Sequence, residues 1–251
     1  MILYSVDNSV AGITLNRPEK RNALNDELIA AIKQGLKQAA GDESVRVIVI
    51  SGAGKDFCSG ADLSAIQKVA QASVADNADD ARSLLELFLL IRQIPAPVVA
   101  AVKGRALAGG CGLASACDLV LASETARFGY PEVKIGFVPA MVLAILRRNV
   151  SEKRAFELLV RGEEIGAAHA KEIGFVNQVF SDDTFDADVS EYVRKFGELS
   201  RTAVALTKGL LYQVDGLSFT DALETGADVN VIARLTEDCR QRIAKFLNKD
   251  K

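Results

Sequence analysis

The sequence of 251 residues contains no tryptophan and only one histidine, His169. This histidine lies in a polar helical stretch, residues 167–172, distant from the glycine-rich segments described below. We interpret it as a surface residue, which leaves no histidine for a Ser-His-Asp or Cys-His triad. The four cysteines lack the paired spacing of metal ligands, so we expect no metal site. Cys111 and Cys117 stand in an apolar stretch, as buried thiols of a reduced, cytoplasmic protein do.

Long hydrophobic runs and a strong charge of one sign are also missing. Residues 106–122 form the longest weakly polar stretch, which is too short for a membrane span and contains Asp118. No basic leader followed by an apolar segment opens the chain. The net charge of −3 and the pI near 5.4 disfavour nucleic acid or a membrane surface as a partner. No GxGxxG or Walker pattern is present, so bound NAD and nucleotide hydrolysis are unsupported.

Hydrophobic residues make up 49% of the chain, which is enough for a sizeable core. In the first half, short β-patterned runs alternate with stretches of helical period. Such alternation predicts an α/β layered core. The predicted strands are residues 2–6, 10–16, 45–50, 98–102 and 119–121, and the main helices between them are residues 26–40 and 81–92.

After about Met141 the pattern is mostly helical, with one short strand at residues 176–179. We therefore predict a core of residues 1–145 and a helical C-terminal region of residues 146–251, with no linker between them. The polar, acidic and Ala-rich stretch at residues 67–80 is interpreted as a mobile loop or a frayed helix start. The predicted C-terminal helices are residues 142–149, 151–160, 167–173, 185–200, 202–214, 219–234 and 237–247.

Two glycine-containing turns follow predicted strands and enter predicted helices, at residues 56–63 and 106–113. A strand-to-helix turn leaves backbone N–H groups free at the positive end of the helix dipole. Two such amides aimed at one point would stabilise a developing oxyanion. Glycines in these places also serve tight turns and close helix–strand packing, so the pattern alone leaves both interpretations open.

Several ordered segments resemble the enoyl-CoA hydratase/isomerase family, the crotonase superfamily. They are residues 16–25, 59–63, 106–114, 128–139 and 162–177, and the similarity extends to the C-terminal helix. The resemblance implies a β-β-α spiral core with a C-terminal helical layer. It also implies homotrimers or a dimer of trimers, in which that layer supports trimerisation and pocket closure.

The resemblance further implies an acyl-CoA substrate, with no cofactor beyond its CoA moiety. The amides of Ala61 and Gly109 match the pair that holds the thioester oxygen. Residues matching the CoA-binding positions come from both ends of the chain: Arg17, Lys20, Arg21, Ala61, Asp62, Leu63, Phe246 and Lys249. A strand-capping role for Arg17, simple solvation of Lys20, Arg21 and Lys249, and a bracing role for Asp62 are the alternatives.

Glu132 matches one of two catalytic glutamates in this family, whereas Gly112 stands where the second is expected. A single carboxylate is sufficient for a proton shuttle between C2 and C4 of an enoyl thioester, and hydration is easier with two. Glu86 is a conceivable substitute for the missing carboxylate. The alternatives are a lyase, decarboxylase or dehalogenase reaction on a CoA thioester, or a non-catalytic member that binds CoA or RNA.

Overall fold

The protein folds around a six-stranded sheet of order β1-β2-β3-β4-β6-β9. The structure, a computed structural model, describes residues 1–69 and 71–248. Strand β1 pairs antiparallel with β2, and the remaining neighbours are parallel. The strands are β1 (Ile2–Asp7), β2 (Val10–Leu15), β3 (Val47–Gly52), β4 (Val98–Val102), β6 (Leu119–Ser123) and β9 (Gln178–Phe180).

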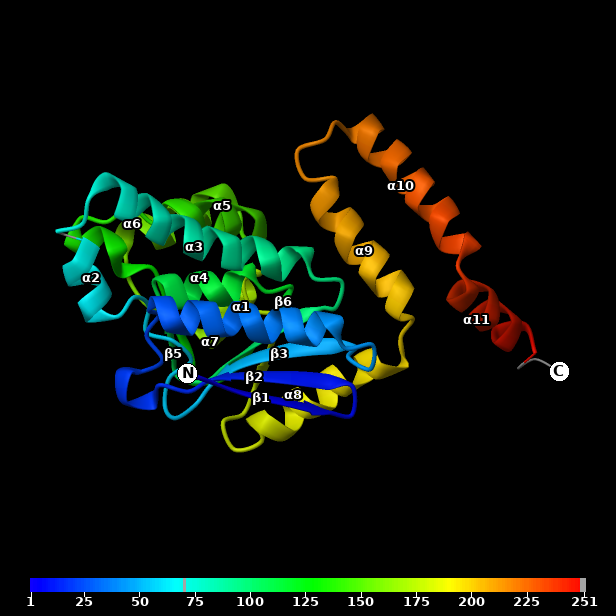
Figure 1. Ribbon diagram of the computed structural model, residues 1–251, viewed down its shortest axis with the longest axis horizontal. Coiled ribbons are helices and arrows are strands. Elements are labelled where there is room, and N and C mark those ends of the chain that lie inside the picture. The colour runs from blue at the N-terminus through cyan, green and yellow to red at the C-terminus, as the bar shows by residue number, and fades with distance from the viewer. Residues whose placement is uncertain (70, 249–251) are drawn as a thin grey trace.

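Alternate residues of this sheet enter two apolar cores. Ile48, Val98 and Ala100 face a large core shared with α1 (Asp26–Gly41), α3 (Val74–Gln93) and α4 (Gly109–Ala116). Val47 and Val99 face a smaller core under α8 (Phe185–Arg194), on the opposite side of the sheet (Figure 1). The period of two along each strand places successive side chains on opposite faces. Buried β-branched residues on both faces therefore explain why these strands are nearly continuous hydrophobic runs.

A second, three-stranded sheet of order β5-β7-β8 lies at the end of the first. It contains β5 (Arg105–Leu107), β7 (Arg127–Gly129) and β8 (Ile165–Gly166). A 3₁₀ helix, η2 (Pro131–Ile135), follows β7, and α5 (Ala140–Asn149), α6 (Glu152–Arg161) and α7 (Ala167–Glu172) follow in the chain. Two further 3₁₀ turns are η1 (Pro18–Lys20) and η3 (Lys195–Glu198).

Residues 67–80 are mostly helical, so the loop interpretation of this stretch is wrong for its described part. Helix α2 (Leu63–Val69) covers its start, and α3 begins at Val74, seven residues before the predicted helix. Ser73 caps α3, because its hydroxyl accepts the amide of Asp76 while the Asp76 side chain bonds back to the Ser73 backbone. This capping box stabilises a helix start that the polar, Ala-rich composition hides.

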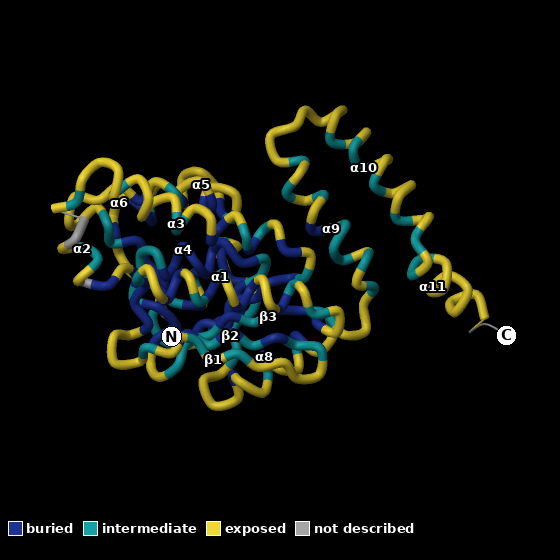
Figure 2. Tube along the Cα trace, in the orientation of Figure 1, coloured by how far each residue is buried: buried dark blue, intermediate teal, exposed yellow. Residues whose placement is uncertain are grey.

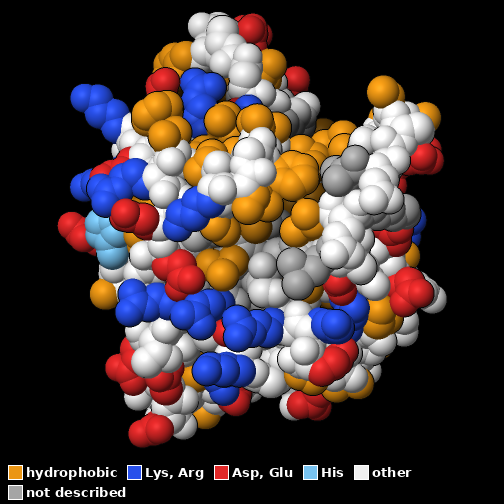
Figure 3. Space-filling model, turned by 90° about the vertical axis from the view of Figure 1, so that its left-hand side faces the viewer, with side chains coloured by type: hydrophobic (Ala, Val, Ile, Leu, Met, Phe, Trp, Pro, Cys, Tyr) orange, Lys and Arg blue, Asp and Glu red, His pale blue; other side chains and the backbone are white. Residues whose placement is uncertain are grey.

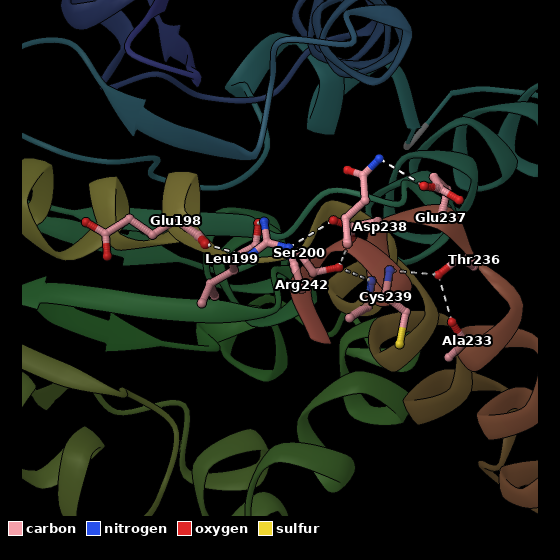
Figure 4. A network of polar contacts seen from close by, with 11 residues as sticks. Glu198, Leu199, Ser200, Ala233, Thr236, Glu237, Asp238, Cys239 and Arg242 are labelled. Carbon is pink, nitrogen blue, oxygen red and sulfur yellow. Dashed lines mark hydrogen bonds and ion pairs between the residues drawn. The ribbon is translucent and has the colours of Figure 1, made fainter. Parts of the chain in front are cut away.

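The last three helices, α9 (Arg201–Gln213), α10 (Phe219–Leu235) and α11 (Glu237–Leu247), form an arm beside the core (Figure 1). We call these residues the C-terminal arm. Most of its surface is exposed or half-buried (Figure 2). Arg242 in α11 joins the arm to the residues that precede α9. It donates to the carbonyls of Glu198 and Leu199 at 3.1 and 3.0 Å and pairs with Asp238 (Figure 4).

A buried polar cluster attaches the arm to the core. Lys208 is 7% exposed, and its Nζ donates to the carbonyls of Ile91 and Ala96 and lies 2.7 Å from Asp118. Asp118 also accepts the Val98 amide at 2.6 Å and the Tyr212 hydroxyl at 2.7 Å. Asp118 thus satisfies the backbone where β4 starts, and it additionally anchors α9.

The predicted elements are otherwise present, with boundaries shifted by a few residues. Strand β4 and helix α11 begin and end where the sequence places them, whereas β3 starts two residues later than predicted. Strands β8 and β9 and helix α8 complete the sheets and cores of the first half, so residues 146–251 are not all separate from it. The division at residue 145 stays a prediction. Within residues 1–69 and 71–248, no helix is both long and apolar enough for a membrane span.

Candidate active site

The two glycine turns predicted from the sequence lie side by side in space. Cys58 forms an isolated parallel bridge with Ala106, in which its N–H and C=O bond Arg105 and Leu107. Two residues further on, a Cβ placed on Gly60 would lie 2.8 Å from the Cβ of Ala108 and 3.7 Å from the Gly109 nitrogen. Only glycine permits this approach, and Gly60 also has a φ of +98°.

Among the residues that the structure describes, the backbone pattern gives the amides of Ala61 and Gly109 no local partner. Leu24 donates to Gly60 O at 2.7 Å and accepts from Asp62 N at 2.9 Å, so the peptide N–H of Ala61, between them, points away from Leu24. Gly109 is the first residue of α4, where an N–H has no intrahelical acceptor. Two accessible donors therefore belong to adjacent backbone segments.

A strained residue sets the direction of the Gly109 amide. Ala108 has φ 48° and ψ −125°, a conformation that residues with a Cβ rarely adopt. Its N–H donates to Gly129 O at 2.8 Å, and its carbonyl accepts from Gly112 N at 2.9 Å. Strain of this kind costs about 1–3 kcal/mol and is concentrated at functional sites. The pattern of residue types gave no signal for it.

Glu132 lies in η2, directly after Pro131, and is half-buried. Burial raises the pKa of its carboxyl above the ordinary value of 4.5. Its Oε2 atom is buried and has no hydrogen-bond partner among the described residues. The charge of Glu132 also acts on the buried thiol of Cys111 and the buried hydroxyl of Tyr130. A carboxylate with a raised pKa and an unused buried oxygen is suited to acid–base chemistry.

The position of the expected second glutamate is closed by apolar side chains. A Cβ on Gly112 would lie 2.4 Å from Val142 Cγ1 and 3.2 Å from Phe88 Cζ. Glu86 does not replace the missing group, because its carboxylate is 61% exposed and pairs with Lys33 at 2.9 Å. The substitute role considered for Glu86 is therefore not supported. His169 is exposed and pairs with Glu172, in agreement with its interpretation as a surface residue.

The residues predicted to bind CoA are distributed between structural and exposed positions. Arg17 pairs with Asp62 at 2.8 Å and donates to Ala23 O at 2.6 Å. The Ser64 amide, together with Arg17 and the Ser64 hydroxyl, lowers the pKa of Asp62 to about 2, so this carboxylate braces its turn as an anion. Lys20 is exposed, and Arg21 lies 3.7 Å from Asp56.

The other predicted CoA ligands are Leu63, Phe246 and Lys249. Leu63 begins α2, and Phe246 is 70% exposed on α11. Lys249 lies outside the described residues. Figure 3 shows a row of Lys and Arg side chains that crosses one face of the molecule below an apolar region. CoA binding by the residues named in the sequence analysis stays a prediction.

A family profile described as Enoyl-CoA hydratase/isomerase matches residues 5–251. The chain belongs to the enoyl-CoA hydratase/isomerase family. A Thermus thermophilus relative whose name contains the words enoyl-CoA hydratase is 40% identical over 96% of this chain and 95% of its own length. The 2,3-dehydroadipyl-CoA hydratase of Escherichia coli is 34% identical over 99% and 96%. The crystal structure of a Mycobacterium smegmatis enoyl-CoA hydratase superposes with a TM-score of 0.94 at 34% identity, covering 99% of this chain and 96% of that one.

These similarities confirm the crotonase fold, and they place the chain among acyl-CoA enzymes of this family. They leave the choice of reaction to the residues of the site. Sequence reasoning did not identify Phe88 and Val142 as the residues that close the Gly112 position, since their hydrophobic spacing indicates only core packing. In the part of the chain that the structure describes, no group of His, Cys, Asp or Glu side chains is arranged to hold a metal ion.

Proposed function

We propose that this member of the enoyl-CoA hydratase/isomerase family moves a proton next to a thioester carbonyl, with Glu132 as its single acid–base group. The observation that carries the proposal is the buried Oε2 of Glu132, which has no partner among the described residues, together with the action of the Glu132 charge on Cys111 in the helix that Gly109 opens. The Ala61 and Gly109 amides would hold the thioester oxygen. Each such donor contributes about 3 kcal/mol to transition-state stabilisation.

Double-bond migration is the first candidate reaction. The Glu132 carboxylate removes a proton from C2 of a 3-enoyl-CoA, and the electron pair moves onto the thioester oxygen held by the two amides. The protonated Glu132 then returns its proton to C4, which leaves a double bond between C2 and C3. One carboxylate is sufficient because it serves as base and then as acid.

Hydration of a 2-enoyl-CoA is the second candidate. The names of the relatives favour it, since the Escherichia coli protein is called a hydratase of 2,3-dehydroadipyl-CoA. Hydration is disfavoured here because Glu132 would contact the reacting water without a second glutamate, since position 112 is a glycine.

Incubation with crotonyl-CoA and with 3-hexenoyl-CoA, followed for water addition and bond migration, tests the base assignment. We expect Glu132→Gln to lower turnover by at least about 100-fold. Glu172→Gln, a matched change at a carboxylate that is 74% exposed, should leave turnover unchanged. Equal turnover of Glu132→Gln and the parent would refute the assignment, and CoA binding without any turnover would indicate a non-catalytic member.

We also propose that the chain assembles into a homotrimer or a dimer of trimers through its C-terminal region. Two different apolar surfaces support this proposal. One is a groove of about 940 Å³ that includes Phe137, Val138 and Phe156, and the other is on the C-terminal arm, where Phe219 is 80% exposed. Unlike surfaces that pair between copies form closed rings where the rotation between copies closes, rather than twofold dimers. Analytical ultracentrifugation should show a trimer or hexamer, and a monomer at micromolar concentration would contradict the proposal.

The compartment is proposed from the cysteines. Cys58, Cys111 and Cys117 are buried and free, which supports a reducing location such as the cytoplasm. Recovery of the native protein in another compartment by cell fractionation would contradict this.

A further inference from the structure

The wall beside Gly112, in the helix that Gly109 opens, is filled by apolar side chains. Gly112 lies three residues after Gly109 in α4, so both occupy the same face of that helix. Val142 on α5 and Phe88 on α3 press against Gly112, and each is 4% exposed. An added Cβ would come 2.4 Å from Val142 Cγ1, a separation that no side chain tolerates.

A water molecule at this wall would be poorly held. Buried waters make about three hydrogen bonds, and apolar cavities stay empty. Val142 and Phe88 offer none, so a water here would depend on other polar atoms, and the buried Glu132 Oε2 and Tyr130 hydroxyl are two that lack a partner among the described residues. A proton that moves from carbon to carbon on one carboxylate needs no water at all.

We infer that Val142, with Phe88 beside it, is the specificity-determining residue that favours double-bond migration over hydration. The inference rests on the proposed function. Val142 occupies the room that a carboxylate at position 112 would need, and it also denies a second set of hydrogen bonds to water. The hydration step adds the oxygen of water to C3 and a proton to C2, so it requires a held water and a proton donor, whereas migration requires neither.

The hydroxyl of Tyr130 is an alternative determinant of hydration. It is buried, lacks a hydrogen-bond partner among the described residues and lies in the electrostatic range of Glu132. If this hydroxyl holds a reacting water, hydration depends on Tyr130 and not on the wall at Gly112. The experiment below separates the two.

The geometry indicates which variant opens the wall. In Val142→Ala the Cγ1 atom is removed, and the nearest remaining atom of residue 142, its Cβ, lies 3.7 Å from a Cβ on residue 112. That distance is an ordinary van der Waals contact. Phe88 Cζ, at 3.2 Å, then needs to move by only a few tenths of an ångström. Gly112→Glu combined with Val142→Ala therefore installs a carboxylate, and Gly112→Gln with Val142→Ala is the matched control without charge.

The assay is the ratio of hydration to bond migration, measured with crotonyl-CoA and 3-hexenoyl-CoA. We expect the parent to favour migration, and the Glu double variant to raise the ratio by roughly tenfold or more, because a positioned acid–base group contributes factors of 10² to 10⁴. The Gln double variant should not raise it beyond Val142→Ala alone. Thermal melting of each variant checks folding, and if both double variants fail to fold, a several-fold higher ratio in Val142→Ala is the required result.

Three results would overturn the inference. They are equal ratios in the Glu and Gln variants, a parent that hydrates at least as fast as it migrates the double bond, and loss of hydration in Tyr130→Phe with no response at Val142. Failure of the proposed function itself is recognised separately, because Glu132→Gln would then retain the activity of the parent in every one of these assays.

Discussion

The buried pair of Lys208 and Asp118 leads to a quantitative prediction for Lys208→Met. The lysine is 7% exposed and donates to the carbonyl of Ile91 in the last turn of α3, to that of Ala96 in the loop that follows, and to Asp118. Methionine matches its length but leaves the Asp118 carboxylate with only the Val98 amide and the Tyr212 hydroxyl. Removing one partner of a buried ion pair costs about 3–5 kcal/mol. We take about 3 kcal/mol, because those two hydrogen bonds remain.

For a chain of this size, 1 kcal/mol shifts the melting temperature by about 2–4 °C, so Lys208→Met should melt about 6–12 °C lower. Differential scanning calorimetry measures this shift, and limited proteolysis at residues 215–217 reports whether the C-terminal arm has loosened. Lys195→Met, at a lysine whose side chain is 70% exposed, is the control. Asp118→Asn in the Lys208→Met background should recover part of the loss, since it removes the unpaired charge. Melting within about 2 °C of the parent for Lys208→Met, or no recovery in the double variant, would refute the reasoning.

Two further predictions concern stability. Burial raises the folded-state pKa of Glu132 above 4.5, so folding disfavours the charged form of this carboxyl. Glu132→Gln should therefore raise the melting temperature at pH 7, and this gain should vanish as the pH falls below 4.5. Melting curves recorded at both pH values would check this. Gly104→Ala should leave little folded protein, because the φ of Gly104 is +60° and the new Cβ would lie 2.0 Å from Lys55 O. Gly226 lies within a helix and has no atom within 4 Å of an added Cβ. Gly226→Ala should therefore raise the free energy of unfolding, measured by chemical denaturation, by about 0.5–1 kcal/mol. A Gly104→Ala variant that folds with the stability of the parent would contradict the close contact between Gly104 and Lys55.

Much of the fold follows from the sequence pattern because its periods are strong. The run Val98–Val102 is buried throughout and is a central strand, as its β-branched composition predicts. The start of α3 was missed, because a capping box at Ser73 supports a helix whose first turns are polar and exposed. The short strands β5, β7 and β8 were also missed, since two- or three-residue strands depend on their partners and carry no period of their own.

The candidate site shows the same division. The residues proposed to carry its chemistry, Ala61, Gly109 and Glu132, stand in motifs that the family resemblance selects from the sequence. The residues that we infer to shape the site act through backbone conformation and side-chain volume. Ala108 contributes a strained φ, and Val142 contributes volume against a glycine thirty positions earlier in the chain. Neither property is visible in a residue type.

By itself, the sequence determined the class of fold and the family, because local periods and ordered motifs depend on residue type and spacing. Tertiary structure alone decided that a Cβ on Gly60 would lie 3.7 Å from the Gly109 nitrogen, that Oε2 of Glu132 is buried without a partner among the described residues, and that a Cβ added at position 112 would lie 2.4 Å from Val142 Cγ1. These are properties of distances between segments remote in the chain, and packing fixes such distances only when the whole domain has folded.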